Sequence, residues 1–403
     1  MGRLIFHVDV NSAFLSWEAV FRLRYLHEEL DIRTVPSAIG GDRESRRGII
    51  LASSIPAKKL GVRTPEPIVD ALRKCPELLL FEPRGDFYHE CSHAFMDILR
   101  EYTDLVEPFS SDETAVDLSE CREALDNPVG FADMLRARIY NELGFTVNIG
   151  VSVNILLAKM ASDFTKPDRT HTLFPEEIPA KMWPLPVRDL MYIGRATAIR
   201  LNDLGIHTIG QLAHMDIDLL TPYFGKSSAG MVASANGIDD TPVTVERSEL
   251  KGYGNSTTLP ENITDRDDAL RVILGLCESV GSRMRRDNAR VRVISVAIRD
   301  GNFDKLSHQM TMDNATSITN ELYGYAVRIF TELWDGRPIR ALGVHTSGIS
   351  KDDTRQISLF DTVDYGKMEK ADRVMDELRR KFGKGTVKRA SLLDKSNDEE
   401  EEG

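Results

Sequence analysis

Short apolar runs alternate with amphipathic segments over the first part of the chain. Three runs are rich in β-forming residues and bounded by polar ones, which predicts buried strands at 4–10 (LIFHVDV), 48–54 (GIILASS) and 145–154 (FTVNIGVSVN). Aromatic residues at helical spacing predict a helix after the first strand (Phe14, Trp17 and Phe21), and LLAKMASDF predicts another after the third. Strands interleaved with helices predict an α/β or α+β core that ends at about Lys166-Pro167.

The pattern changes beyond this core. Residues 175–186 are Pro-rich connecting chain, and 187–238 hold two short helical blocks punctuated by glycines. The polar stretch 239–250 is typical of a linker. Strand-like and helical runs alternate again over 252–349, which predicts a further α/β domain. The remaining residues are polar and charged, and their acidic end is predicted to be disordered.

Length and composition are those of a globular protein. A chain of 403 residues can form two to four domains, and its apolar content of 41% is ordinary for a soluble protein. No run approaches the ~18 apolar residues of a membrane span, and MGRLIFHVDV has no secretion signal, so we expect a cytoplasmic protein without a membrane partner. The four cysteines lack the paired spacing of a zinc site or a disulfide framework (Cys75, Cys91, Cys121 and Cys277).

The net charge of −12 argues at first against a polyanionic partner, but its distribution matters more. The stretch from Asp394 to Glu402 holds six acids against one Lys. By contrast, 283–292 holds five arginines against one Asp, so a local basic strip is available for phosphates. A solvated charged face is the alternative interpretation of this strip.

Three carboxylates carry the candidate chemistry. Asp9 ends the first predicted strand, and Asp112-Glu113 precede the strand-like TAVDLS. Carboxylates gathered at neighbouring strand ends repel one another unless hard cations neutralise them, and oxygen-rich sites of this kind suit Mg²⁺. Two such ions can assist an in-line phosphoryl displacement. A solvated acidic turn at 112–113 is the alternative.

Four separated strings then resemble the Y-family of translesion DNA polymerases in order and spacing. They are HVDVNSAF (7–14), PSAIGGDRESRRGIILASSIPAKKLGVRTPEP (36–67), SSDETAVDLS (110–119) and GVSVNILLAKMASDFTKPD (150–168). The resemblance continues through IGRATAIRLNDLGI and FGKSSAGMVASANGIDDTPV and covers about residues 3–350.

The family implies an α+β multidomain fold, a right-hand polymerase. The resemblance places a palm at 1–20 and 78–170, small fingers at 21–77, a helix-hairpin-helix thumb at 171–240, a linker at 241–250, an α/β little finger at 251–350 and a C-terminal tail at 351–403.

The family also implies the residues of a catalytic site. Asp9, Asp112 and Glu113 match its metal-binding carboxylates, with the Val10 carbonyl completing the shell of one of two Mg²⁺ ions. Phe14 matches the steric gate that excludes a ribose 2′-OH; a core aromatic is the alternative. The incoming dNTP is expected to meet the following residues: Asn11, Ser12, Ala13, Phe14, Lys58 and Lys159. Taken alone, Lys159 would be an ordinary surface lysine.

Further motifs imply binding of primer-template DNA and of a sliding clamp, the β subunit. Gly194 and Arg195 lie in a stretch similar to a helix-hairpin-helix, although such glycines are also common in helix loops. The little finger would contribute Arg283, Arg285, Arg286, Arg290 and Arg292. QISLF (356–360) resembles a clamp-binding pentapeptide anchored by Gln356, Leu359 and Phe360, with a short edge strand as the alternative.

Some positions depart from the family pattern. Ile55 stands where most members carry a Tyr, Ala13 replaces a second aromatic at the gate, and Tyr192 replaces the first hairpin glycine. Lys58 and Asp9-Val10-Asn11 favour the polymerase V catalytic-subunit branch over polymerase IV. The sequence leaves the role of 361–393 unassigned.

We therefore expect a monomeric, template-directed DNA polymerase that performs translesion synthesis by transferring a dNTP to a primer 3′-OH. One alternative is another palm-type enzyme such as a nucleotide cyclase, which has no use for a hairpin domain or a clamp peptide. Another is a non-enzymatic or impaired relative that binds DNA or the clamp.

Overall fold

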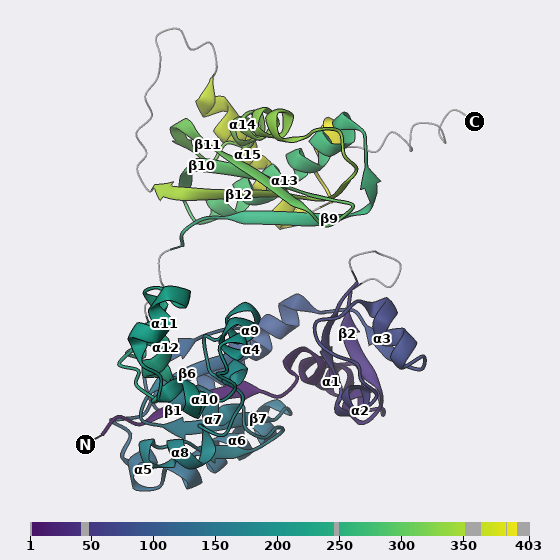
Figure 1. The fold of residues 1–403 in the computed structure, drawn as a ribbon. Coiled ribbons are helices and arrows are strands. Elements are labelled where there is room, and N and C mark those ends of the chain that lie inside the picture. Colours follow the sequence, from purple (N-terminus) through teal and green to yellow (C-terminus); the bar gives the residue numbers. More distant parts are fainter. Residues whose placement is uncertain (1, 42–47, 246–249, 351–363, 384, 393–403) are drawn as a thin grey trace. The chain divides into compact units, whose positions relative to one another are not determined.

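The computed structural model describes residues 2–41, 48–245, 250–350, 364–383 and 385–392. The described residues up to 245 form one compact unit, and those from 250 onward form another (Figure 1). Within these ranges no helix combines the length and apolarity that a membrane crossing needs.

The first unit is built on a five-stranded sheet whose order is β5-β6-β1-β7-β8. Its strands are β1 (Ile5–Val10), β5 (Val106–Pro108), β6 (Glu113–Asp117), β7 (Val147–Ser152) and β8 (Thr170–Thr172). The central β1 pairs antiparallel with β6 and β7, and all six of its residues are buried. The apolar runs predicted as strands at 4–10 and 145–154 are therefore confirmed.

Alternate residues of β1 face two different layers. Phe6 and Val8 belong to the large core, together with residues of α1 (Ala13–Tyr25), α4 (Gly85–Arg100) and α6 (Pro128–Leu143). Ile5 packs instead with residues of α7 (Ile155–Ser162).

Gly150 of β7 allows α7 to lie close to the sheet. A Cβ atom at this position would stand 1.9 Å from the Ala158 carbonyl oxygen. Any side chain at Gly150 would therefore push α7 away from β7, and α7 carries Lys159 of the candidate site.

A smaller sheet of order β3-β2-β4 occupies the region predicted as fingers. It consists of β2 (Ser37–Gly40), β3 (Ile50–Ser53) and β4 (Leu79–Phe81), accompanied by η1 (Ile32–Thr34), α2 (Ile55–Lys59) and α3 (Ile68–Lys74). Ala38, Ile50 and Ile68 help to form its separate small core. The strand predicted at 48–54 corresponds to β3.

Short helices make up the part that follows the five-stranded sheet. They are η2 (Pro175–Glu177), α8 (Ile178–Lys181), η3 (Val187–Asp189), α9 (Arg195–Asp203), α10 (Ile209–Ala213), α11 (Ile217–Phe224) and α12 (Ser227–Ala235). Their core includes Leu201, Ile209 and Leu212 and continues onto Leu157 of α7. Another short helix, α5 (Arg122–Asp126), precedes α6.

The second unit is a four-stranded antiparallel sheet of order β11-β10-β12-β9. Its strands are β9 (Gly254–Ile263), β10 (Arg290–Asp300), β11 (Lys305–Thr316) and β12 (Ile339–Ser350). Two amphipathic helices, α13 (Arg266–Arg286) and α14 (Thr319–Leu333), share its core. Strands and helices follow one another over 252–349 as the sequence pattern indicated, and every strand pairing in this sheet is antiparallel.

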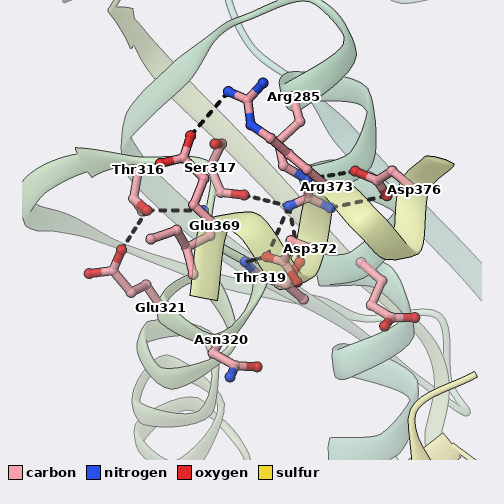
Figure 2. A network of polar contacts seen from close by, with 12 residues as sticks. Arg285, Thr316, Ser317, Thr319, Asn320, Glu321, Glu369, Asp372, Arg373 and Asp376 are labelled. Carbon is pink, nitrogen blue, oxygen red and sulfur yellow. Dashed lines mark hydrogen bonds and ion pairs between the residues drawn. The ribbon is translucent and has the colours of Figure 1, made fainter. Parts of the chain in front are cut away.

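A C-terminal helix, α15 (Tyr365–Phe382), and the short η4 (Ala390–Leu392) also belong to the second unit. Figure 2 shows the polar network at this junction. The Arg285 side chain is only 5% exposed and donates to Asp376 at 2.7 Å and to the Ser317 carbonyl at 2.7 Å. Asp372 also faces Arg285, at 3.2 Å.

Asp372 and Glu278 are the carboxylates that tie the C-terminal segment to the earlier helices. Asp372 is 2% exposed and accepts from the Thr319 backbone N–H at 2.8 Å and from Arg389 at 2.7 Å. Glu278 on α13 accepts from Arg379 at 3.2 Å and from Arg389 at 2.7 Å. Each buried charge therefore has an opposite partner, which is the condition for burying it without a large loss.

We expect Asp372→Ala to lower the free energy of unfolding of the second unit by about 3–5 kcal/mol, because it leaves the buried Arg285 undercompensated. Chemical denaturation measures this change. Glu377→Ala, at an exposed position of the same helix, is the control, and we expect it to change stability by less than about 0.5 kcal/mol. Equal effects of the two substitutions would contradict a structural role for the network.

Candidate active site

The three predicted carboxylates meet where β1 and β6 lie side by side. The antiparallel register sets Asp9 directly opposite Glu113, so both side chains point to the same face of the sheet. The Val10 N–H donates to the Asp112 carbonyl at 2.9 Å. This hydrogen bond brings Asp112, the residue before Glu113, to the same strand end. All three acids line one cleft of about 980 Å³.

Two lysines form ion pairs with Asp9 and Glu113 in the structure. Lys159 of α7 lies 2.7 Å from Glu113 Oε1 and 3.4 Å from Asp9 Oδ2. Lys166 lies 2.9 Å from the same Asp9 oxygen and 2.9 Å from Asp163. Because Asp9 is 5% exposed, these cations supply the charge compensation that a buried carboxylate needs.

The pKa directions at the site reflect burial and charge. Burial raises the pKa of Glu113, and the hydrogen bond from Lys159 offsets that effect only in part. Burial lowers the pKa of Lys159, but its hydrogen bond to Glu113 and the charges of Asp163 and Asp9 outweigh burial, so the pKa rises. Burial and the positive charge of Lys159 lower the pKa of His7 to about 3, so His7 is neutral at pH 7.

The donor set fits a hard divalent cation by its chemistry. The carboxylate oxygens of Asp9 and Glu113 lie close enough together for the Lys159 ammonium group to contact both. Carboxylate oxygens are the ligands that hard divalent cations prefer. Asp112 is held differently, since its carboxylate accepts from the Ser110 hydroxyl at 2.7 Å. Among the described residues no three or more His, Cys, Asp or Glu side chains form a group arranged to hold a metal ion.

The turn from β1 into α1 forms one wall of the cleft. Ser12 adopts a left-handed φ of 48° and α1 starts at the next residue, without a side-chain cap on its first N–H groups. Lys58 of α2 reaches across and donates to the Ser12 hydroxyl at 2.8 Å. Burial and the nearby positive charge of Lys166 lower the pKa of Lys58.

The predicted nucleotide contacts take two kinds of position. Asn11, Ser12, Ala13, Phe14 and Lys58 line the cleft, as does Ile55, whereas Lys159 is not among the residues that line it. The Asn11 side chain is turned to internal partners, because it donates to Asn148 at 3.1 Å and accepts from the Asp168 backbone N–H at 2.8 Å. Asn11 thus fixes the segment that follows Lys166.

Phe14 is half-buried at the edge of the large core and also lines the cleft. Its ring stacks on Tyr88 of α4, with ring centroids 5.2 Å apart and planes 15° apart. The Tyr88 hydroxyl donates to the buried Glu18 at 3.1 Å. Both interpretations of Phe14, core aromatic and cleft-facing gate, are therefore compatible with its position.

Lys166 and Tyr88 are the site residues that sequence reasoning missed. Lys166 lies within the family-like stretch 150–168, before Pro167 and between Asp163 and Asp168. This position near two acids is the signal by which Lys166 could have been found. No comparable signal marks Tyr88, because its aromatic partner, Phe14, lies far earlier in the chain.

The predicted hairpin precedes α9. Tyr192 adopts φ of 72°, the left-handed conformation that a glycine would take most easily. Gly194 is the N-cap of α9, and Arg195 is its exposed first residue. The hairpin backbone therefore keeps a glycine-like turn despite the substitution at its first position.

The five arginines predicted to contact DNA do not share one surface. Arg285 is enclosed by the network of Figure 2, a placement that does not favour contact with DNA. Arg283 donates to the Gly254 carbonyl at 2.6 Å, and Arg290 faces Glu369 at 3.4 Å. Arg286 and Arg292 are exposed. The predicted clamp peptide, 356–360, lies outside the described residues.

Family models match most of this chain. The impB/mucB/samB family model matches residues 8–163, the helix-hairpin-helix motif model of the IMS family matches 175–206, and the C-terminal domain model of the impB/mucB/samB family matches 250–359. A solved Y-family DNA polymerase chimera shares the fold with a TM-score of 0.73 at 23% identity, covering 86% of this chain and 99% of its own. The expected α+β right-hand polymerase fold is thereby confirmed.

The chain therefore belongs to the impB/mucB/samB family of Y-family DNA polymerases. DNA polymerase IV of Clostridium acetobutylicum is 45% identical to it over 396 residues, which cover 98% of this chain and 99% of the relative. DNA polymerase IV 1 of Bacillus subtilis is 34% identical and covers 98% of this chain and 94% of its own length. These names are at odds with the expected closeness to the polymerase V branch, which stays unconfirmed.

Proposed function

We propose that this protein is a template-directed DNA polymerase that performs translesion synthesis, as expected of its family. The observation that carries the proposal is the meeting of Asp9, Asp112 and Glu113 at one cleft that also holds Lys58 and Lys166. Acids that can bind divalent cations thus lie beside amines that can bind phosphates.

In this proposal the three carboxylates and the Val10 carbonyl hold two Mg²⁺ ions. When bound, the ions supply Lewis-acid stabilisation to the attacking and leaving oxygens of phosphoryl transfer. Lys159 compensates the negative charges of Asp9 and Glu113 in the structure, a role that bound ions would take over. No side chain at the cleft is assigned as a covalent nucleophile, so the protein contributes positioning and charge neutralisation.

The triphosphate of the incoming dNTP is proposed to bind between Lys58, Lys166 and the start of α1. The pKa of Lys58 is lowered by burial and by Lys166, so an anion placed between these amines relieves their mutual repulsion. The uncapped N–H groups at the start of α1 also favour an anion. Phe14 is proposed to exclude the ribose 2′-OH.

We expect Lys166→Ala to raise the KM for dNTP by about 10-fold to 100-fold, because one charge-assisted contact to phosphate is lost. Steady-state single-nucleotide insertion measures this effect. Lys59→Ala is the control, because Lys59 is an exposed neighbour of Lys58 that does not line the cleft. We expect this variant to have the parent KM for dNTP. If Lys166→Ala left KM at the parent value, Lys166 would not bind the triphosphate.

The remaining parts of the proposal concern the binding of primer-template DNA and of the sliding clamp. The hairpin at Gly194 and Arg195 is proposed to contact the DNA backbone, as are the exposed Arg286 and Arg292. Arg283 and Arg290 stay candidates for the same role. Gln356, Leu359 and Phe360 are proposed to anchor the chain to the sliding clamp, which raises the local concentration of polymerase at the primer end. The catalytic chain is proposed to act as a monomer.

Running-start primer extension on damaged and undamaged templates tests the function. We expect labelled primers to lengthen only with a template and dNTPs, and the double replacement of Asp112 and Glu113 by Ala to abolish lengthening. A parent chain that binds primer-template but never extends it would favour the non-enzymatic alternative. Nucleotide turnover without a template would favour a cyclase-like enzyme.

A further inference from the structure

Two histidines lie one turn apart on α4, a helix of the first unit (Figure 1). His89 and His93 are both exposed, whereas Cys91 and Ser92 between them are buried. Residues four positions apart are neighbours on a helix surface, so the two imidazole rings meet on the solvent side of α4. Neither ring lines the cleft that holds the three carboxylates, so the pair takes no part in the proposed nucleotide site.

The two rings approach one another through their Nε2 atoms. These nitrogens are 3.2 Å apart, whereas the ring centroids are 4.3 Å apart and the ring planes stand at 86°. Two imidazole nitrogens that bind one Zn²⁺ ion at ~2.0–2.1 Å with tetrahedral angles are roughly 3.3 Å apart. The observed separation therefore fits two ligands of a single ion.

A hydrogen bond between the rings is the competing interpretation of this contact. In a neutral imidazole one nitrogen carries a proton, so one Nε2 can donate to the other. Because both side chains are exposed, water competes for the same donor and acceptor, and the net gain from such a bond is small. An ion that replaces the shared proton therefore displaces little binding energy.

The sequence around the pair also favours a metal ion. Residues 89–93 read His-Glu-Cys-Ser-His, the H-E-x-x-H spacing that sets two zinc-binding histidines on one face of a helix. The exposed acids Asp86 and Glu90 belong to the same part of α4 and attract a cation. Imidazole nitrogens suit borderline ions such as Zn²⁺ and Ni²⁺, whereas Mg²⁺ prefers oxygen ligands.

The positive charges at the two ends of α4 are compensated elsewhere. Arg84 forms an ion pair with the buried Glu18, and Arg100 forms one with Asp97. Within the described ranges no third His, Cys, Asp or Glu side chain joins the two histidines in a group arranged for a metal. Two imidazoles can hold an ion whose remaining positions are taken by water, but a catalytic zinc site needs three protein ligands. The pair thus supports metal binding and no hydrolytic chemistry.

We propose that His89 and His93 form a binding site for a borderline divalent transition-metal ion such as Zn²⁺ on α4. This site is separate from the carboxylates proposed to bind Mg²⁺ and goes beyond the proposed function. Because the ion bridges two consecutive turns, it binds the folded helix in preference to the unfolded chain and stabilises the first unit.

The test is a calorimetric titration of the full chain with Zn²⁺ in excess Mg²⁺, which occupies oxygen-rich sites. We compare the parent with H89Q, H93Q and H89Q/H93Q. The control H207Q/H214Q removes two other exposed histidines of the first unit, which lie on different turns and have separate partners. Thermal unfolding with and without Zn²⁺ verifies that each variant is folded and measures the stabilisation.

The proposal predicts one Zn²⁺ site in the parent and in the control that is lost in H89Q/H93Q. Outer-shell partners of a metal are worth about 10-fold to 100-fold in affinity, so each single substitution of a direct ligand should weaken binding by at least about 10-fold. Zn²⁺ should raise the unfolding temperature of the parent and the control but not of H89Q/H93Q.

Three results would overturn the proposal. They are absence of Zn²⁺ binding by the parent, parent affinity in H89Q/H93Q, and an equal loss in the control. The two rings would then form a hydrogen bond only. Failure of the proposed function is distinguishable, because it shows as absent template-dependent extension and leaves the Zn²⁺ titration unaffected.

Discussion

Asp9→Ala is expected to lower kcat for nucleotide insertion by at least about 1,000-fold while primer-template affinity stays within about threefold. Asp9 lies opposite Glu113 and is buried with two lysines on its carboxylate. Its loss removes one of the proposed metal-binding carboxylates, so the developing charge on the reacting oxygens would be less well stabilised.

Single-turnover kinetics at saturating dNTP measure this loss, and thermal unfolding shows whether the variant is folded. Asp104→Ala replaces an exposed acid of the same unit and should retain the parent rate. Because Lys159 and Lys166 keep Glu113 and Asp163 as partners, we expect the Asp9 variant to remain folded. A folded variant with the parent rate would show that Asp9 takes no part in the chemistry.

Phe14→Ala should raise kcat/KM for ribonucleotides by about 100-fold or more, with a change of less than about 10-fold for dNTPs. The ring lines the cleft and is held by stacking on Tyr88, so its removal opens space at the proposed position of the 2′-OH. The ratio of the two kcat/KM values is the informative quantity, because a general loss of packing lowers both.

Phe87→Ala is the control for this substitution. Phe87 is a partly buried aromatic that packs against the same core but is not among the residues lining the cleft. We expect it to leave the ratio for ribonucleotides and dNTPs unchanged. If the Phe14 variant also kept the parent ratio, Phe14 would be a core aromatic and not a gate.

Much of the scaffold could be predicted from the sequence. The apolar runs at 4–10 and 145–154 form adjacent strands because short apolar runs rich in β-forming residues are typical of strands buried on both faces, and β1 and β7 are buried throughout. The acids at the ends of two strands also indicated a shared site, and the register of β1 with β6 sets Asp9 opposite Glu113. These features depend on local pattern and on strand pairing.

Other features depend on packing between distant segments. Lys159 could be a surface lysine by its spacing, yet the close approach of α7 at Gly150 brings it between two acids. Arg285 belonged to a basic strip in the sequence, but the structure pairs it with Asp372 and Asp376 of a helix some 90 residues later. No local pattern indicates which charge is compensated by a distant partner.

The most direct test is a diffraction measurement on crystals of the chain with primer-template, a non-hydrolysable dNTP analogue and Mn²⁺ in place of Mg²⁺. The account predicts two anomalous peaks at carboxylate-bonding distance, about 2.1–2.3 Å, from oxygens of Asp9, Asp112 and Glu113, with Lys159 displaced from them. Clear density for the analogue with no anomalous peak at these acids would contradict it.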